Sequence, residues 1–160
     1  MPDRENEKVA ILRNVLARDG LLGGLGYLNS LTPHRFTGVF LADGEKLRNV
    51  ALFDRTDPAV RPWEAFPMLH SYCSIVLATG KSFSTNNSMD DYRVRDHAAR
   101  ESVRAYCGVP LLDSEGRVLG TLCHFDFVAR SADLVDIELM LEIPAAIAPY
   151  LHECLQGAER

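Results

Sequence analysis

The sequence contains no apolar run approaching the roughly 20 residues that a helix needs to cross a bilayer. Its first residues, MPDRE, lack the apolar core of a signal peptide. The 17 basic residues are scattered along the chain, and the formal net charge is -5, which argues against a surface for nucleic acid. We therefore expect a cytoplasmic protein with neither a membrane nor a nucleic acid as partner.

Paired cysteines of the C-x-x-C kind are also absent. The four cysteines each lie in an apolar run, which predicts buried thiols rather than disulfides or zinc ligands: Cys73, Cys107, Cys123 and Cys154. No metal site is expected. Nothing in the sequence identifies a cofactor, although haem stays open because a single axial histidine such as His70, His97 or His124 would suffice.

What the chain does contain is enough apolar sequence for one core. Of its 160 residues, 47% are hydrophobic and 24% charged, which is typical of a globular protein. We expect a single domain over residues 1–160, with a core at about 21–151 and an amphipathic N-terminal helix at about 3–18. Asp3 can cap that helix, Asp19-Gly20 can end it, and residues 21–31 predict a second helix.

The stretch 104–127 is the centre of the predicted fold. Two apolar runs, 105–112 and 118–127, flank the polar group Asp113-Ser114-Glu115-Gly116, and this order indicates a β-hairpin. Pro110 removes one ladder donor, while Gly108 and Gly120 allow close approach of another backbone or a ligand. We therefore expect a bent or bulged hairpin.

The string Y-C-G-V-P-L-L-D-S-E-G-R-V-L-G-T-L-C-H-F-D resembles the C-terminal half of a GAF domain. There, a G-V-P-L segment, an acidic-Gly turn and a G-x-L-C-x-x-D strand follow one another. Upstream, S-Y-C-S-I-V-L-A-T-G-K-S resembles the GAF helix that ends in T-G-x-x. The resemblance covers roughly residues 21–151. It implies an α+β fold with a central antiparallel sheet of about six strands, terminal helices on one face and a loop-covered pocket on the other.

The remaining elements are predicted from periodicity and turn residues. A second hairpin is expected from strands 36–42 and 47–53 around Asp43-Gly44-Glu45. The other expected elements are a helix over 68–78 ended by Gly80, a strand over 82–85, a loop over 86–95, a short helix capped by Asp96 through about 102, and a helix over 131–154.

Three prolines and the only tryptophan make residues 54–67 an irregular segment. Trp63 is expected to anchor this segment, or alternatively to close over a ligand. In the C-terminal helix, Ser131 or Asp133 can supply the cap, and Pro144 and Pro149 predict a kinked or divided helix. Only residues 156–160 are expected to be loose.

Catalysis by cysteine is disfavoured, and no catalytic residue is predicted. Cys123 and His124 are adjacent on a predicted strand, so their side chains point to opposite faces and cannot form a nucleophile–base pair. Some GAF proteins reduce free methionine sulfoxide through thiols in the pocket and loop. The loop at 86–95 contains no cysteine.

A ligand pocket is the remaining hypothesis for the site. Strand 103–112 has an apolar face and a mixed face, and polar groups on an otherwise apolar face can orient a ligand. Arg104 has an alternative role as a structural ion pair with Asp126 or Asp91. The candidate ligand-binding residues are Tyr72, Cys73, Asp91, Tyr92, Arg93, His97, Arg104, Tyr106 and His124.

These observations predict a small-molecule-binding or signal-sensing module without chemistry of its own, acting through another chain whose identity is unknown. The small-molecule ligand is also unknown. Two alternatives stay open: a thiol-dependent reductase of the free methionine sulfoxide type, and a dimerisation scaffold whose pocket is filled by side chains. Two arrangements of the terminal helices also stay open: a homodimeric bundle, and packing of both helices on one face of their own sheet.

Overall fold

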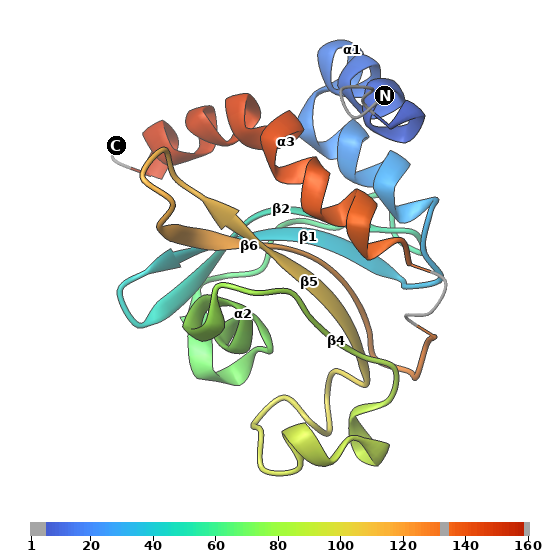
Figure 1. The fold of residues 1–160 in the computed structure, drawn as a ribbon, viewed down its shortest axis with the longest axis vertical. Coiled ribbons are helices and arrows are strands. Elements are labelled where there is room, and N and C mark those ends of the chain that lie inside the picture. The colour runs from blue at the N-terminus through green and yellow to red at the C-terminus, as the bar shows by residue number, and fades with distance from the viewer. Residues whose placement is uncertain (1–5, 132–134, 159–160) are drawn as a thin grey trace.

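One six-stranded antiparallel sheet forms the middle layer of the molecule (Figure 1). The computed structural model describes the backbone of residues 6–131 and 135–158, and the side chains as far as residue 151. The strand order is β3-β2-β1-β6-β5-β4. The strands are β1 Phe36–Asp43, β2 Lys46–Asp54, β3 Phe66–Pro67, β4 Phe83–Thr85, β5 Ala105–Leu112 and β6 Val118–Asp126. The expected sheet of about six strands is confirmed.

Both predicted hairpins are present. β1 pairs with β2 across a turn in which Gly44 has φ 61°, and β5 pairs with β6 across a turn in which Gly116 has φ 82°. Such left-handed backbone favours glycine because it has no Cβ. The ladder of β5 and β6 shifts register between Leu111 and Leu112, so the expected bulge is also confirmed.

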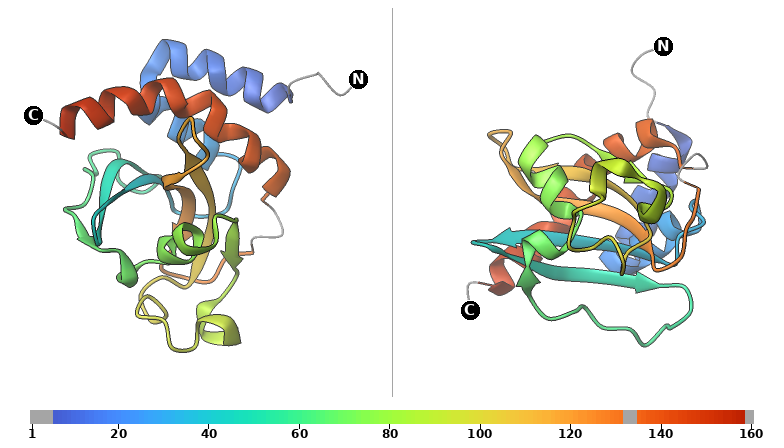
Figure 2. Two further views of the ribbon diagram at one scale, coloured as in Figure 1. Left: turned by 60° about the vertical axis from the view of Figure 1, so that its left-hand side comes forward. Right: turned by 90° about the horizontal axis from the view of Figure 1, so that it is seen from below.

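Helices α1, Glu7–Asn29, and α3, Ile137–Ala158, cover one face of the sheet (Figures 1 and 2). α1 consists of two helical segments joined at Gly20, whose φ is 77°, as the sequence predicted. The side chain of Asn6 caps its start by accepting from the Lys8 amide at 2.8 Å. Asp3, the predicted cap, lies outside the described residues.

α3 contains both Pro144 and Pro149 and changes direction along its length (Figure 2). The carboxylate of Asp136 accepts a hydrogen bond from the Leu139 amide at 3.0 Å, so the helix begins later than expected and Ser131 does not cap it. Asp133, the other predicted cap, lies outside the described residues. None of the helices in the described ranges is long and apolar enough to cross a bilayer.

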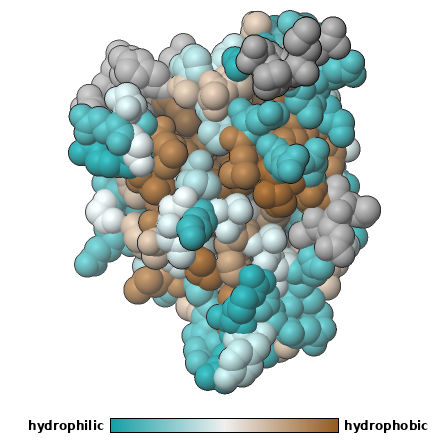
Figure 3. Space-filling view, viewed as in Figure 1, coloured by the Kyte–Doolittle hydropathy of each residue, from teal (hydrophilic) through white to brown (hydrophobic). Residues whose placement is uncertain are grey.

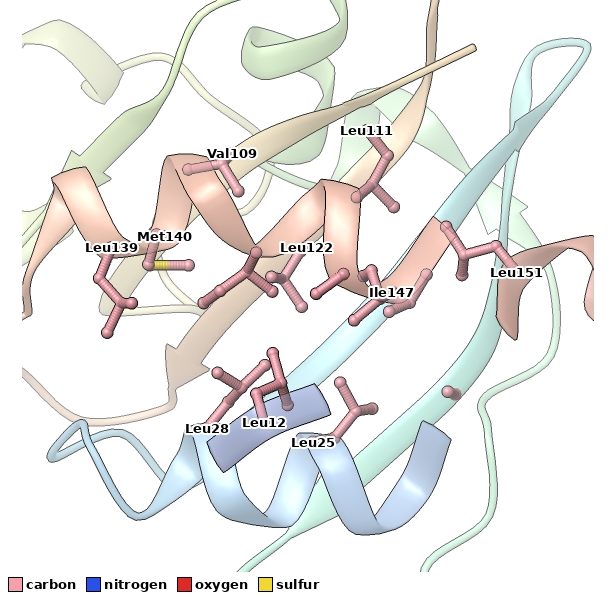
Figure 4. Packing of buried hydrophobic residues seen from close by; sticks show 14 of the residues in the cluster. Leu12, Leu25, Leu28, Val109, Leu111, Leu122, Leu139, Met140, Ile147 and Leu151 are labelled. Atoms are coloured by element: carbon pink, nitrogen blue, oxygen red, sulfur yellow. The ribbon is translucent and has the colours of Figure 1, made fainter. Parts of the chain in front are cut away.

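The main core lies between the sheet and these two helices (Figure 4). Leu12, Leu25 and Leu28 of α1 face Met140 and Ile147 of α3 over the sheet. The sheet contributes Val109, Leu111 and Leu122, which are 0%, 2% and 0% exposed. Val109 and Leu111 belong to the face of strand 103–112 that the alternation predicted to be apolar. Both terminal helices therefore pack on one face of their own sheet.

The opposite face is covered by short elements and loops (Figures 1 and 2). The helix predicted over 68–78 is in fact divided into the 3₁₀ turn η1, Met68–His70, and α2, Cys73–Thr79. Ser71 separates them because its backbone is extended, with φ -129° and ψ 149°. Gly80 ends α2 in the left-handed conformation, as expected.

The segment between β4 and β5 contains no α-helix, and all of it lies within the described residues. Its regular pieces are two 3₁₀ turns, η2 Ser88–Asp90 and η3 Tyr92–Val94. The helix predicted from Asp96 to about residue 102 was wrong, because this part of the chain forms successive turns. Asp96 is followed by His97, whose ring accepts from the Ala99 amide and holds the turn.

Candidate small-molecule pocket

A cavity of about 240 Å³ lies on the sheet face opposite α1 and α3. Its floor consists of side chains from β1, β5 and β6, and its walls come from η1, the start of α2 and the irregular segment before β3. The lining is mainly aromatic: Phe40, Trp63, Phe66, His70, Ser71, Tyr72, Val103, Tyr106, Cys123 and Phe125.

Alternation along the central strands places the floor residues. Cys123 and Phe125 of β6 are two residues apart and so point to the same face, while Leu122, the residue before Cys123, enters the helix-side core. Phe125 stands opposite Tyr106 of β5 and Phe36 of β1 in the strand register. This face contains large rings in the middle of the sheet.

Trp63 forms part of one wall. Its ring makes edge contacts with Phe36 and Phe125, with centroid distances of 5.8 and 5.5 Å. Its backbone amide donates to Asn49 Oδ1 on β2 at 2.9 Å. Trp63 therefore anchors the irregular segment, as predicted, and at 37% exposure it also stands at the boundary between the cavity and solvent.

The polar groups beneath the cavity are two hydroxyls and two thiols, those of Tyr106, Thr121, Cys73 and Cys123. The Tyr106 hydroxyl donates to Cys73 Sγ at 3.3 Å, and Thr121 Oγ1 lies 3.0 Å from the same sulfur. Burial raises the pKa of Tyr106 well above its ordinary value, so this phenol remains a hydrogen-bond donor at neutral pH. Of the predicted site residues, Tyr72 and Tyr106 line the cavity, and Cys73 contacts Tyr106.

His97 lies behind this cavity wall. Its ring is 4.7 Å from that of Tyr72, and its Nε2 is 3.2 Å from Ser74 Oγ. Because Nδ1 accepts from the Ala99 amide at 3.0 Å, Nε2 carries the proton in the neutral ring. Burial lowers the pKa of His97, which favours this neutral form. His97 supports Tyr72 and does not line the cavity.

Asp91, Tyr92 and Arg93 come together at a second, open hollow beside β4. The Arg93 guanidinium contacts Asp91 at 2.6 Å and donates to the Ser84 carbonyl at 2.7 Å. Hydrogen bonding from Arg93 lowers the pKa of Asp91 to about 2. These charges satisfy each other within the loop, and Tyr92 is 73% exposed. The structure thus places this trio away from the aromatic cavity.

The last two predicted residues also lie elsewhere. Arg104 Nε donates to the Glu101 carbonyl at 3.1 Å. The expected ion pair of Arg104 was wrong, because Asp126 pairs with Arg130 and Asp91 with Arg93. His124 points to the helix side of the sheet, where its Nδ1 is 2.7 Å from Thr37 Oγ1. Cys123 and His124 do lie on opposite faces, as the strand prediction required.

Several lining residues were not among the predicted site residues. Phe40, Phe66 and Phe125 are apolar, whereas all the residues predicted from the sequence carry a polar or ionisable group. Their signal was available in the alternation of the predicted strands, which placed Phe125 on the same face as Cys123. No cluster of three or more metal-ligating side chains occurs within the described ranges.

The fold is an α+β domain with helices on one face of an antiparallel sheet, and on the other face an aromatic cavity that is the candidate ligand site. The family model for the GAF domain matches residues 10–148, and the chain belongs to this family. No curated protein sequence matches the chain.

Solved structures with the same fold include two reductases and a GAF domain of a phosphotransferase. The type II free methionine-R-sulfoxide reductase from Thermoplasma acidophilum is 19% identical, with a TM-score of 0.62 over 89% of this chain and 96% of that chain. The free methionine-R-sulfoxide reductase from Neisseria meningitidis is 16% identical, with a TM-score of 0.63 over 98% and 95%. The GAF domain of Acinetobacter phosphoenolpyruvate-protein phosphotransferase is 13% identical, with a TM-score of 0.62 over 91% and 95%. At these identities the likeness concerns the fold.

Proposed function

We propose that this chain is a cytoplasmic sensor module that binds a small apolar molecule in the aromatic cavity and signals through another chain. The observation that carries the proposal is the lining of the 240 Å³ cavity, in which aromatic rings predominate. An apolar cavity of about 150 Å³ is large enough to bind benzene. A single aromatic ring with a short substituent therefore suits this space, and aromatic walls favour such a ligand. The free thiols of Cys73, Cys107 and Cys123 suit a reducing compartment.

The same lining disfavours a free amino acid as substrate. A zwitterion requires partners for both a carboxylate and an ammonium group, because burying an unpaired charge is costly. None of the ten lining residues has a carboxylate or a guanidinium group. The cavity also favours ligand binding over a scaffold whose pocket is filled by side chains. Reduction of free methionine sulfoxide is therefore the less supported alternative.

Trp63 allows a direct test, because it is the only tryptophan and it lines the cavity. Native mass spectrometry of freshly purified protein should first reveal any retained molecule by its extra mass. Titration with toluene and with other alkylbenzenes, which do not absorb or emit like tryptophan, should then change the Trp63 fluorescence emission in a saturable way. Val103→Phe, which adds a ring at the cavity wall, should weaken toluene binding by at least about tenfold, or ~1.4 kcal/mol.

Val128→Phe is the matched control, because Val128 is 51% exposed and does not line the cavity. Its toluene affinity should equal that of the unmodified protein. Equal weakening by both substitutions, or no saturable binding at all, would contradict the proposed ligand class. Steady turnover of free methionine-R-sulfoxide with a thiol reductant, abolished by Cys73→Ser, would replace the sensor function by the reductase.

We further propose that the module forms a homodimer through its helical layer. Ile11 of α1 and Leu141 of α3 are 46% and 53% exposed, although the opposite sides of both helices are buried. In Figure 3, hydrophobic residues gather on the face where α3 crosses the molecule. A second copy of this layer would remove these side chains from water. The dimer would bring two cavities into one assembly for an output partner.

A further inference from the structure

The fold brings together two thiols that are 50 positions apart in the sequence. Cys73 is the first residue of α2 and Cys123 lies near the end of β6. They are 1% and 0% exposed, and both belong to the same buried cluster on the cavity side of the sheet. Thr121, whose hydroxyl contacts the Cys73 sulfur, is two residues before Cys123 and shares its strand face. Tyr106 and Thr121 contact the Cys73 sulfur from the neighbouring strands of the sheet. Two free thiols that are neighbours in one buried cluster can form a reversible disulfide when an oxidant reaches them.

The environment of this pair favours one thiolate. Burial by itself would raise the pKa of Cys73, but hydrogen bonds from Cys123, Ser71, Thr121 and Tyr106 lower it to about 7. Burial, together with the neighbouring Cys73, raises the pKa of Cys123 well above its ordinary value. The pair therefore shares its last proton, and one sulfur is ionised in a large fraction of molecules at neutral pH.

Cys107 provides an internal contrast. It is also buried, but on the helix side of the sheet. Among the described residues, the hydrogen-bond partner of its sulfur is the Met140 sulfur, at 3.6 Å. Burial raises the pKa of Cys107 to about 12. An isolated buried thiol of this kind is inert. The hydroxyl groups around Cys73 are thus a specific feature of the cavity side.

The cavity gives access to the pair. Cys123 lines its floor, so a small molecule inside the cavity meets this sulfur, while Cys73 lies behind it in contact with Tyr106. The walls are aromatic and exclude large polar oxidants such as glutathione disulfide. A hydroperoxide with an apolar group combines an oxidising O–O bond with a body that fits these walls.

We propose that Cys73 and Cys123 form a redox-active dithiol, which an apolar organic hydroperoxide entering the cavity oxidises to a disulfide. The Cys123 sulfur, after its proton passes to Cys73, attacks the terminal oxygen of the hydroperoxide. An S–O bond forms, the O–O bond breaks, and the alkoxide takes up a proton and leaves as an alcohol. Cys73 then attacks the sulfenic sulfur, forming the S–S bond and releasing water. Two thiols lose two electrons, and one hydroperoxide becomes one alcohol and one water.

The disulfide would tie α2 to the central strand beneath the cavity. This chemistry goes beyond reversible ligand binding and needs only that a small molecule can enter. Toluene titration, measured on the same preparations, separates the two proposals, since binding without oxidation would contradict the redox inference alone. Oxidation without toluene binding would instead contradict the proposed ligand class.

The test is to treat reduced protein with cumene hydroperoxide or hydrogen peroxide, block the remaining thiols with N-ethylmaleimide and map peptides without reduction. We expect a Cys73–Cys123 peptide, with Cys107 fully alkylated after unfolding. For each peroxide, the rate of protein oxidation is divided by its rate of reaction with free cysteine in the same buffer. This corrected rate should be at least about tenfold higher for cumene hydroperoxide than for hydrogen peroxide. Val103→Phe should remove most of that preference, whereas Val128→Phe should leave it unchanged.

Single substitutions identify the two steps. Cys123→Ser should abolish the disulfide. Cys73→Ser removes the group that accepts the Cys123 proton, so it should slow the oxidation and leave its product as a sulfenic acid on Cys123 that dimedone traps. Cys107→Ser should leave the rate and the disulfide unchanged; circular dichroism of each variant confirms that it is folded. The inference would be overturned if the Cys107 thiol were oxidised as fast as the Cys73 and Cys123 thiols. It would also be overturned if folded protein gave no Cys73–Cys123 disulfide-linked peptide. Equal corrected rates with both peroxides would overturn the assignment of an apolar oxidant.

Discussion

His34 and His124 are buried next to each other on the helix side of the sheet, with ring centroids 6.0 Å apart and nearly parallel planes. Thr32 Oγ1 lies 2.6 Å from His34 Nδ1, and Thr37 Oγ1 lies 2.7 Å from His124 Nδ1. Burial lowers the pKa of His34 to about 4, with Asp126 opposing the shift and Arg130 and Arg55 adding to it. Burial, His34 and Arg55 lower the pKa of His124 to about 3. Both rings are therefore neutral in the folded protein at physiological pH.

This pair predicts acid sensitivity at the scale of single residues. Because the folded pKa values lie below the ordinary 6.5, the unfolded chain binds more protons between pH 6.5 and about 4. Stability from these groups is complete above about pH 6.5 and is lost as pH falls. Urea unfolding should show a loss of about 4 kcal/mol between pH 7.5 and 5.0, at about 1.4 kcal/mol for each pKa unit.

His124→Gln should reduce that pH-dependent loss by about half, whatever its effect on stability at pH 7.5. His70→Gln is the control, because His70 is exposed and its substitution should leave the pH dependence unchanged. An unchanged pH dependence in His124→Gln would contradict the assignment of the acid sensitivity to this buried ring.

At the scale of elements, the close contact between β1 and β6 depends on Gly120. Gly120 stands opposite Leu41 in the register, and both strands belong to the middle of the sheet. A Cβ placed on Gly120 would overlap the Phe40 carbonyl oxygen and lie 2.8 Å from Leu41 Cα. Backbone atoms cannot rotate away as the end of a side chain can. The two strands would have to separate locally.

Gly120→Ala should therefore destabilise the protein by about 3 kcal/mol or more, which is the upper range for overpacking. Gly116→Ala is the comparison. Its φ of 82° makes alanine strained, at roughly 1–2 kcal/mol, but a Cβ there meets nothing within 4 Å. Urea unfolding of both variants should rank Gly120→Ala as the more destabilised. The reverse order would show that the strand contact adapts easily.

At the scale of the whole molecule, the helical layer has one buried side and one side with exposed apolar residues. Leu12 and Leu16 of α1 are buried against the core, while Ile11 on the same helix is exposed. Leu139 and Met140 of α3 are buried next to the exposed Leu141. Intramolecular packing therefore accounts for only part of the apolar surface of these helices.

The proposed homodimer predicts that Leu141→Glu, alone or with Ile11→Glu, weakens self-association by at least about tenfold. A buried carboxylate without a partner disfavours such an interface. Leu69→Glu is the control, since Leu69 is 72% exposed in η1 on the cavity side. Sedimentation velocity over a range of concentrations measures the dimer fraction. A monomer at all concentrations, or equal weakening by the control, would contradict the helical interface.

Prediction from the sequence succeeded where local rules are strong. The hairpin turns followed from Gly44 and Gly116, and the division of α1 followed from Gly20. It failed at Ser71, whose extended backbone divides the helix predicted over 68–78, because no proline or glycine at that point indicates a break. Of the predicted site residues, Tyr72 and Tyr106 line the aromatic cavity, whereas Asp91 and Arg93 lie at a separate hollow because they satisfy each other within their own loop.

The sequence by itself determined the elements, the apolar face of each central strand and the family, because periodicity, turn residues and motif order are all local. Only the tertiary structure decided which side chains meet. The contact of Cys73 with Thr121, the edge contact of Trp63 with Phe125 and the pairing of Asp126 with Arg130 each join residues from separate parts of the chain. Such contacts depend on how helices and loops pack across the sheet, and spacing along the chain does not specify that packing.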